Sequence, residues 1–208
     1  KGSWLTIWLL KLGAKVWGYS LNYNKKNSIY KEIFVKEIED QRLNLRYFKN
    51  RFGDINDQLN IFNWSLESNP DIVFHLAAQP LVLESYNDPI YTWKTNVIGT
   101  LNLLESLKNI NKRCAVIIIT TDKVYQNQEW EYGYRENDIL GGHDPYSSSK
   151  AGAEIATNSW RLSFCGEKKN QSKYLKVATA RAGNVIGGGD WTDSRIIPDL
   201  VKATVTRS

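Results

Sequence analysis

The chain has 208 residues, 42% of them hydrophobic and 24% charged, a composition typical of a soluble globular domain with one sizeable core. Its net charge of +5 does not predict nucleic-acid binding, because the basic residues are scattered among acidic ones. No apolar run approaches the roughly 20 residues of a membrane span. With only two cysteines and no clustered metal ligands, we expect a reduced, cytoplasmic protein without a metal site.

Elements of two hydrophobic periods alternate along the first third of the chain. A helix is expected over 3–12, closed by Gly13, followed by a strand over 14–19. Polar, irregular chain with a short helix is expected over 22–45. A strand ending near 53–55 and a helix over 57–68 complete this region.

The alternation continues in the rest of the chain, where β-branched runs predict buried strands. Because strands and helices alternate, the sequence predicts parallel βαβ units and an α/β fold with a doubly wound parallel sheet of Rossmann type. The expected elements are a strand over 71–78, a helix over 89–108, a strand over 115–122, a helix over 145–164 and a strand over 176–185.

Tyr146 and Lys150 lie four residues apart near the start of the expected helix over 145–164, so phenol and ammonium share one helix face. A phenol with a pKa near 10 becomes a base near pH 7 only with about 4 kcal/mol of preferential phenolate stabilisation. A neighbouring lysine and a cationic nicotinamide ring can supply it. Taken alone, however, this spacing is more often an ordinary helix-surface pair.

A second polar set, Thr121, Asp122 and Lys123, follows a buried strand at its carboxyl end, where ligands collect in open α/β sheets. The alternative is a solvated or capping strand end. Asp122 and Lys123 can share a site only if the strand has already ended, because adjacent strand residues point to opposite faces. The run HLAAQP at 75–80 offers small residues to a flat nucleotide ring, although His75 is more often a core histidine.

These residues resemble the extended short-chain dehydrogenase/reductase family, which combines a dinucleotide-binding fold with a Tyr-x-x-x-Lys pair, here Tyr146 and Lys150. The resemblance covers essentially the whole chain. Within the family, the motifs are similar to those of nucleotide-sugar 4,6-dehydratases, and Lys123, where dTDP-glucose relatives usually carry glutamate, favours CDP-glucose as the substrate. The matching runs are TDKVY at 121–125, GYREND at 133–138, GHDPY at 142–146 and RAGNVIGGGDW at 181–191.

The resemblance implies NAD as the cofactor and a role for each catalytic residue. Tyr146 would take the proton of the 4-hydroxyl group, Thr121 would hydrogen-bond to that oxygen, and Lys150 would lower the phenol pKa and hold the ribose. Asp122 would protonate the departing C6 hydroxyl group while Lys123 acts at C5. The product would be CDP-4-keto-6-deoxyglucose, with no net redox change.

Binding residues follow from the same resemblance. Asn184 and Arg195, with Thr121, would contact the substrate, although Arg195 could also be an ordinary surface residue. Relatives usually pair through helices equivalent to 89–108 and 145–164, which implies a homo-oligomer. The implied cofactor contacts are Gly2, Asp54, Ile55, Leu76, Ala77, Ala78 and Gln79, together with Tyr146 and Lys150.

Gly2 matches the third glycine of the dinucleotide fingerprint, so we expect the first strand and two earlier glycines to be missing. The chain starts at Lys1 and has no methionine, and both ends are expected to be truncation points. Residues 1–187 would form an NAD-binding domain lacking its first strand, and 188–208 the truncated start of a substrate-binding lobe. We expect this fragment alone to be inactive and poorly stable.

Two other functions fit part of this pattern. A nucleotide-sugar epimerase or a GDP-mannose dehydratase shares the fold and the Tyr-Lys pair, but the Thr-Asp-Lys run argues against a simple epimerase. A non-catalytic dinucleotide sensor would bind cofactor without chemistry, and the intact Tyr146, Lys150 and Asp122 argue against it. The lack of an acidic residue after the strand over 14–19 leaves the preference for NAD over NADP to the resemblance.

Overall fold

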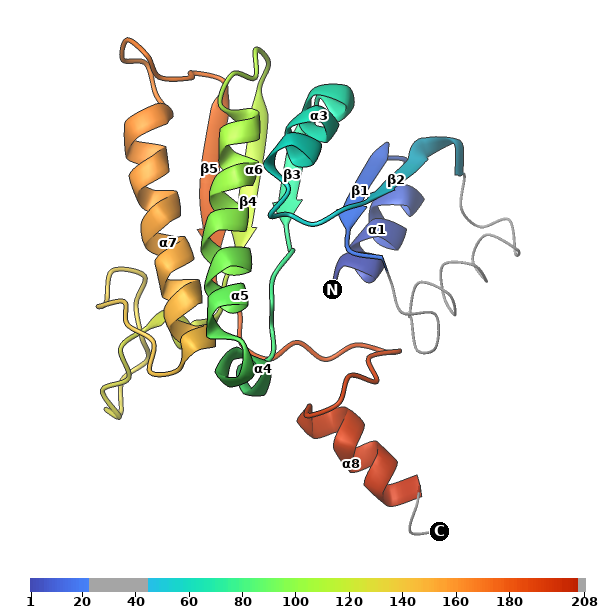
Figure 1. The fold of residues 1–208 in the computed structure, drawn as a ribbon, viewed down its shortest axis with the longest axis vertical. Helices are drawn as coiled ribbons and strands as arrows, with labels where there is room; N and C mark the ends of the chain where they lie inside the picture. Colours follow the sequence, from blue (N-terminus) through green and yellow to red (C-terminus); the bar gives the residue numbers. More distant parts are fainter. Residues whose placement is uncertain (23–44, 206–208) are drawn as a thin grey trace. The chain divides into compact units, whose positions relative to one another are not determined.

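The computed structural model describes residues 1–22 and 45–205. These residues form two compact units: unit 1 comprises Lys1–Gly53 and Asn184–Ser208, and unit 2 comprises Asp54–Gly183. Figure 1 shows the elements of both. Most of the segment that was expected to be irregular, 22–45, lies outside the described residues.

The described part of unit 1 contains a parallel strand pair, two α-helices and a short 3₁₀ helix. Its α1 ends where Gly13, at φ 84°, turns the chain into β1, which confirms the predicted helix and its glycine stop. β1 pairs in parallel with β2, from Val16 opposite Phe48 to Ser20 opposite Phe52. The elements are α1 (Gly2–Lys11), β1 (Val16–Ser20), η2 (Leu45–Tyr47), β2 (Phe48–Phe52) and α8 (Ile196–Val205).

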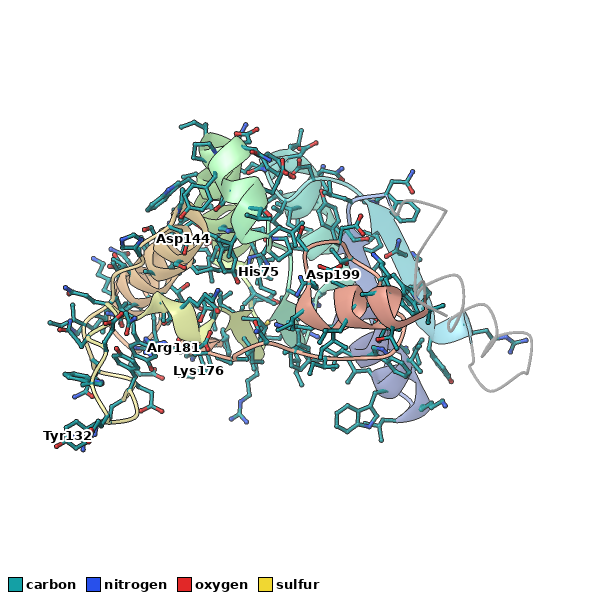
Figure 2. The ribbon with its side chains drawn as sticks, turned by 90° about the horizontal axis from the view of Figure 1, so that it is seen from below. His75, Tyr132, Asp144, Lys176, Arg181 and Asp199 are labelled. Carbon is teal, nitrogen blue, oxygen red and sulfur yellow. The ribbon has the colours of Figure 1, made fainter. Side chains whose placement is uncertain are left out.

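Unit 2 contains a parallel three-stranded sheet in the order β3-β4-β5. Figures 1 and 2 show α3, α6 and α7 on one face of this sheet. The elements are α3 (Gln58–Ser68), β3 (Ile72–His75), α4 (Val82–Asn87), α5 (Pro89–Trp93), η3 (Lys94–Ile98), α6 (Gly99–Leu107), β4 (Cys114–Ile119), η4 (Asp122–Val124), α7 (Pro145–Phe164) and β5 (Leu175–Ala180).

The core of unit 2 lies between the sheet and its helices. In β4, Cys114, Val116 and Ile118 are buried. Ala115, between the first two, is exposed, as the two-residue period of a strand requires. Leu104 and Leu107 of α6, one of the helices on this face, are essentially inaccessible to solvent. The structure therefore confirms the parallel α/β arrangement that the apolar pattern of the sequence predicted.

Several predicted boundaries differ from the structure. The helix expected over 89–108 is divided into α5, the π-helical turn η3 and α6. The strands expected over 71–78, 115–122 and 176–185 end earlier, at His75, Ile119 and Ala180. The chain beyond each strand end is thereby released from the sheet and can form a site. No helix within 1–22 and 45–205 has the length and apolar character needed to cross a membrane.

Candidate active site

The amino-terminal half of α7 presents Tyr146 and Lys150 on one face. Asp144 caps the helix by accepting hydrogen bonds from the Ser147 amide at 3.0 Å and the Ser147 hydroxyl group at 2.6 Å, and Pro145 occupies its first turn. These two signals explain why the predicted helix over 145–164 matches α7 at both ends. Lys150 is buried and Tyr146 half-buried.

The start of α7 is held by a close backbone approach. A Cβ atom on Gly142 would lie 2.1 Å from the Ser148 nitrogen, so only glycine permits the chain to pass here. The Ser148 hydroxyl group donates to the Gly142 carbonyl oxygen at 2.8 Å. The loop before α7 therefore fixes the position of the first helical turn.

Lys150 joins α7 to the carboxyl end of β4. Its ammonium group donates to the carbonyl oxygen of Ile119, the last residue of the strand, at 3.1 Å. His75, at the end of the neighbouring strand, is buried and its Nε2 lies 3.0 Å from the Thr100 hydroxyl oxygen. Burial, followed by the charge of Lys150, lowers the pKa of His75 to about 3. His75 is therefore a neutral, hydrogen-bonded core residue.

Thr121, Asp122 and Lys123 lie at the turn that follows β4. Thr121 is buried, caps η4 through the Lys123 amide at 3.4 Å and donates to the Asp122 carboxylate at 3.0 Å. Asp122 and Lys123 are exposed. Because β4 ends at Ile119 and η4 follows, the strand alternation that would separate these two side chains no longer applies. α7 packs against η4, which brings the two polar sets of unit 2 together.

Asn96, in the π-helical turn, connects the loop after β3 with α7. Its side chain accepts from the Gln79 amide at 2.9 Å and donates to the Gln79 carbonyl oxygen at 3.1 Å and to the Ser149 hydroxyl oxygen at 2.8 Å. Gln79 is buried, and Leu76, Ala77 and Ala78 before it are half-buried. The sequence placed Asn96 in the helix after the 75–80 run, and the structure shows that its partners lie on two other elements.

Asp54 and Ile55 form the chain that enters α3. Asp54 accepts from the backbone amide of Asn56 at 2.9 Å, and the buried Ile55 offers its carbonyl oxygen to the Asn102 side chain at 3.1 Å. Gly99 of α6 approaches so closely that a Cβ atom there would lie 2.6 Å from Ile55 Cγ2. These contacts fix the 54–56 turn against α6.

Gly2, Asn184 and Arg195 belong to unit 1. Gly2 is the first residue of α1, and Asn184 is exposed. Arg195 is half-buried, with Nε 3.8 Å from an Asp190 carboxylate oxygen. In the same unit, the Trp4 indole donates to the Gly188 carbonyl oxygen at 3.0 Å. The amino-terminal end of α1 and the 187–195 segment therefore lie together within unit 1.

An ion pair at 3.1 Å joins the buried Glu154 to the half-buried Arg181, and the sequence did not predict it. Glu154 follows Lys150 by one helical turn and lies on the same face as Tyr146 and Lys150. That spacing is the one signal in the sequence that could have pointed to it. Within 1–22 and 45–205 there is no group of three or more His, Cys, Asp or Glu side chains that could hold a metal ion.

A family model described as GDP-mannose 4,6 dehydratase matches residues 1–168. The chain belongs to this family. Family members include varied nucleotide-sugar enzymes, and this chain is 44% identical over 203 residues to a CDP-glucose 4,6-dehydratase of Salmonella typhimurium. That match covers 98% of this chain and 54% of the relative.

Solved structures support the Rossmann-type fold of this family member. A putative epimerase from Burkholderia cenocepacia matches with a TM-score of 0.73 at 22% identity, covering 99% of this chain and 57% of its own. A UDP-glucuronic acid 4-epimerase from Bacillus cereus, in complex with UDP-glucuronic acid and NAD, matches with a TM-score of 0.66 at 24% identity, covering 86% and 52%. The chain thus spans about half the length of these relatives.

Proposed function

We propose that the complete protein is a CDP-glucose 4,6-dehydratase that uses NAD. The observation that carries this proposal is the meeting of two polar sets in unit 2, the Tyr146-Lys150 face of α7 and the Thr121-Asp122-Lys123 turn, within a chain that is 44% identical to a CDP-glucose 4,6-dehydratase. The match extends over 98% of the chain. Lys123, where dTDP-glucose relatives usually carry glutamate, favours CDP-glucose as the substrate.

The residues present fit a nicotinamide dinucleotide. Ala77 and Ala78 follow the carboxyl end of β3 and are half-buried, so small side chains leave room for a flat ring there. The buried Lys150 ammonium group lies at the end of the next strand. Asp54, Ile55, the 76–79 loop and Gly2 are the other proposed contacts. When bound, NAD would supply a reversible acceptor for the C4 hydride.

In the first step, Tyr146 takes the proton of the 4-hydroxyl group as the C4 hydride leaves, which produces a 4-keto sugar. Thr121, already a buried hydrogen-bond donor in the turn after β4, holds the 4-oxygen. Lys150, fixed by the Ile119 carbonyl oxygen, stabilises the phenolate form of Tyr146. The ketone then makes the C5 proton acidic.

In the second step, Lys123 takes the C5 proton, and Asp122 donates a proton to the C6 hydroxyl group, which leaves as water. Lys123 then returns a proton to C5, and the hydride that NAD would hold when bound would pass to C6. Tyr146 then releases its extra proton to solvent, and Asp122 takes one proton from solvent, so both groups return to their starting states. The substrate loses one water overall, so the reaction is that of a lyase.

The substrate phosphates are assigned to unit 1, where Arg195 supplies a cation of suitable geometry and Asn184 an exposed amide. We propose that residues 1–187 form the NAD-binding domain and that residues 188–208 begin a substrate-binding lobe.

The protein is proposed to be cytoplasmic. Cys114 and Cys165 are free thiols, which fits this setting.

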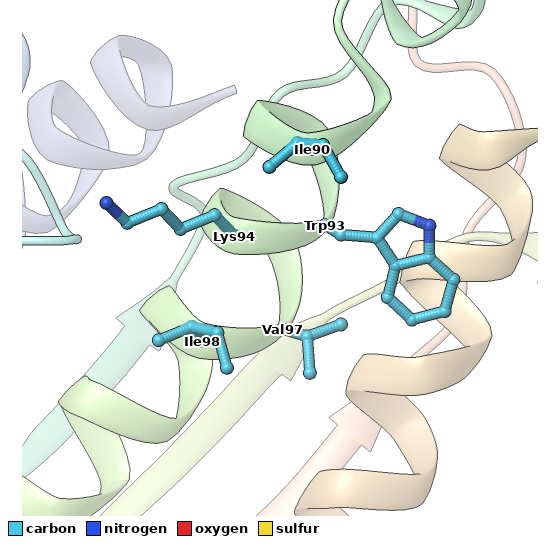
Figure 3. Close-up of a pocket in the computed structure, with 5 residues that line it drawn as sticks. All are labelled: Ile90, Trp93, Lys94, Val97 and Ile98. Carbon is cyan, nitrogen blue, oxygen red and sulfur yellow. The ribbon is translucent and has the colours of Figure 1, made fainter.

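We further propose that the protein pairs with a second copy through α5, η3, α6 and α7. Trp93 and Val97 pack against α7 at Gly152, where a Cβ atom would lie 2.9 Å from the Trp93 ring. Figure 3 shows the apolar hollow beside them, whose wall includes Ile90 and Ile98. Ile90 is 76% exposed, so substituting glutamate there should release monomers in sedimentation experiments if the surface is an interface.

The test is turnover by the full-length protein with NAD, comparing CDP-glucose, dTDP-glucose and GDP-mannose and following the 4-keto-6-deoxy product. Preference for CDP-glucose supports the proposal. Preference for another nucleotide sugar would leave the proposed reaction intact but contradict the proposed substrate. Absence of product from all three, with cofactor bound, would leave an epimerase or a dinucleotide sensor as the better account.

A further inference from the structure

Glu154 of α7 is buried at only 4% exposure, and its carboxylate accepts four hydrogen bonds. The Arg181 Nε and Nη2 atoms each donate at 3.1 Å, to Oε1 and Oε2 respectively. The Thr179 hydroxyl group donates to Oε2 at 2.8 Å, and the Thr120 hydroxyl group donates to Oε1. Every side of the carboxylate is therefore occupied by a donor from β5 or from the chain just after β4 or β5.

These bonds lie directly beside the proposed chemistry. Lys150 binds the carbonyl oxygen of Ile119, and Glu154, one helical turn later, binds the hydroxyl group of the next residue, Thr120. Two consecutive links thus attach α7 to the chain that becomes the Thr121-Asp122 turn. The Asp122 amide donates to the Ala182 carbonyl oxygen at 3.1 Å, which continues the contact toward Arg181.

The Arg181 guanidinium group also contacts the loop over 125–140, through a hydrogen bond from Nη1 and through its flat face. Its Nη1 donates to the Glu136 carbonyl oxygen at 3.0 Å, and its guanidinium group lies 4.8 Å from the centre of the Tyr125 ring. Tyr125 stacks on Tyr134 at 4.9 Å. Figure 2 shows Arg181 beside the sheet and Tyr132 at the outer end of this loop. One guanidinium group therefore connects α7, the end of β5 and the loop.

A buried ion pair is an expensive way to gain stability, because the loss of hydration can exceed the attraction between the charges. Such a pair can nevertheless fix the relative orientation of the elements that it joins. The planar fork of arginine binds a carboxylate in one orientation, which a hydrophobic contact or a lysine cannot reproduce. The fourfold coordination of Glu154 and the further bond to Glu136 fit a role in fixing positions.

We infer that Glu154 and Arg181 are positioning residues, which hold the Thr121-Asp122 turn and the 125–140 loop in register with the Tyr146-Lys150 face of α7. This inference rests on the proposed dehydratase function. Without the pair, the Lys150-Ile119 bond still ties α7 to β4, but the turn that carries Asp122 loses its neighbouring link. Loss of water at C5 and C6 should therefore slow more than oxidation at C4.

The experiment uses the full-length protein with Arg181→Lys and Glu154→Gln, which keep approximate size but remove the fork. Thr157→Val is the matched control: Thr157 is buried on the same helix, and its hydroxyl group has no hydrogen-bond partner among the described residues. Amide hydrogen exchange over 121–140, kcat, KM, thermal stability and the absorbance of reduced nicotinamide during turnover are measured for each.

For both fork variants we expect faster exchange over 121–140 in the absence of substrate and a kcat lowered by up to about 100-fold with little change in KM. Reduced nicotinamide should accumulate during turnover, which a merely destabilised enzyme would not show. The control should match the wild type in all readouts. Unchanged exchange over 121–140 would overturn the inference whatever the turnover, and so would a lower kcat without accumulation of reduced nicotinamide. Wild-type protein that makes no dehydrated product would instead count against the proposed function.

Discussion

Unit 2 and unit 1 differ in how their side chains are held. The described apolar core lies mainly in unit 2, between β4, β5, α6 and α7, whereas α1 of unit 1 buries only Ile7 and Leu10. In α8, Ile196 is 71% and Val205 68% exposed. The proposed catalytic side chains lie in unit 2, where hydrogen bonds hold Thr121 and Lys150. A site of this kind depends on a closed core around it.

The largest expected effect is on activity in unit 2. Tyr146→Phe removes the proposed base and should lower kcat by roughly 10²- to 10⁴-fold while the fold persists. Tyr132→Phe is the control, because Tyr132 is 79% exposed at the outer end of its loop. The two variants are compared by steady-state turnover and thermal unfolding. Similar activity in both would remove Tyr146 from the proposed mechanism.

Matched core truncations test the comparison of the two units directly. Leu104→Ala, at a fully buried position in unit 2, should lower the free energy of unfolding by about 2–5 kcal/mol. Leu10→Ala in unit 1 should cost less, because α1 buries only Ile7 and Leu10, and the described buried apolar residues lie mainly in unit 2. Urea unfolding of both variants gives the two differences. A larger loss for Leu10→Ala would contradict the account of where the core lies.

Acidification should destabilise unit 2 through His75. Because burial and Lys150 lower its folded pKa to about 3, the unfolded state binds the proton first as pH falls below about 6.5. This contribution to stability is fully present above pH 6.5 and is lost progressively toward pH 3, up to a few kcal/mol. His75→Gln should flatten that part of the curve of unfolding free energy against pH, and an unchanged curve would contradict this account of His75.

The smallest expected effect comes from a pair of glycines in the loop before α7. Gly142→Ala should cost about 1–3 kcal/mol, because the added Cβ atom would meet the backbone at Ser147 and Ser148. Gly133→Ala should be nearly neutral, since nothing lies within 4 Å of the new atom. Chemical denaturation measures both. Equal stabilities would mean that the chain before α7 is not held as closely as the structure indicates.

The sequence predicted elements whose signals are local. α7 matched at both ends because Asp144 and Pro145 mark its start. The π-helical turn η3 was missed because it depends on contacts across elements, such as those of Asn96 with Gln79 and Ser149. The helix α4 was also missed, since six residues after Pro80 give too short a period to detect.

In the proposed site, too, the residues with local sequence signals were predicted and those that depend on contacts across elements were not. Tyr146 and Lys150 could be paired from their spacing alone, and the early end of β4 was needed to allow Asp122 and Lys123 to share a site. The pairing of Glu154 with Arg181 joins residues 27 apart on different elements. The spacing of Glu154 from Lys150 is a local signal for Glu154, but its partner Arg181 is revealed only by the folded arrangement.

The central claim is that the hydride removed from C4 returns to C6 of the same molecule. The measurement that tests it most directly uses CDP-glucose carrying deuterium at C4, turned over by the full-length protein and examined by NMR and mass spectrometry. The account predicts a 4-keto-6-deoxy product with the deuterium in its C6 methyl group. Dehydrated product without deuterium at C6 would contradict it, as would an epimerised sugar that retains deuterium at C4.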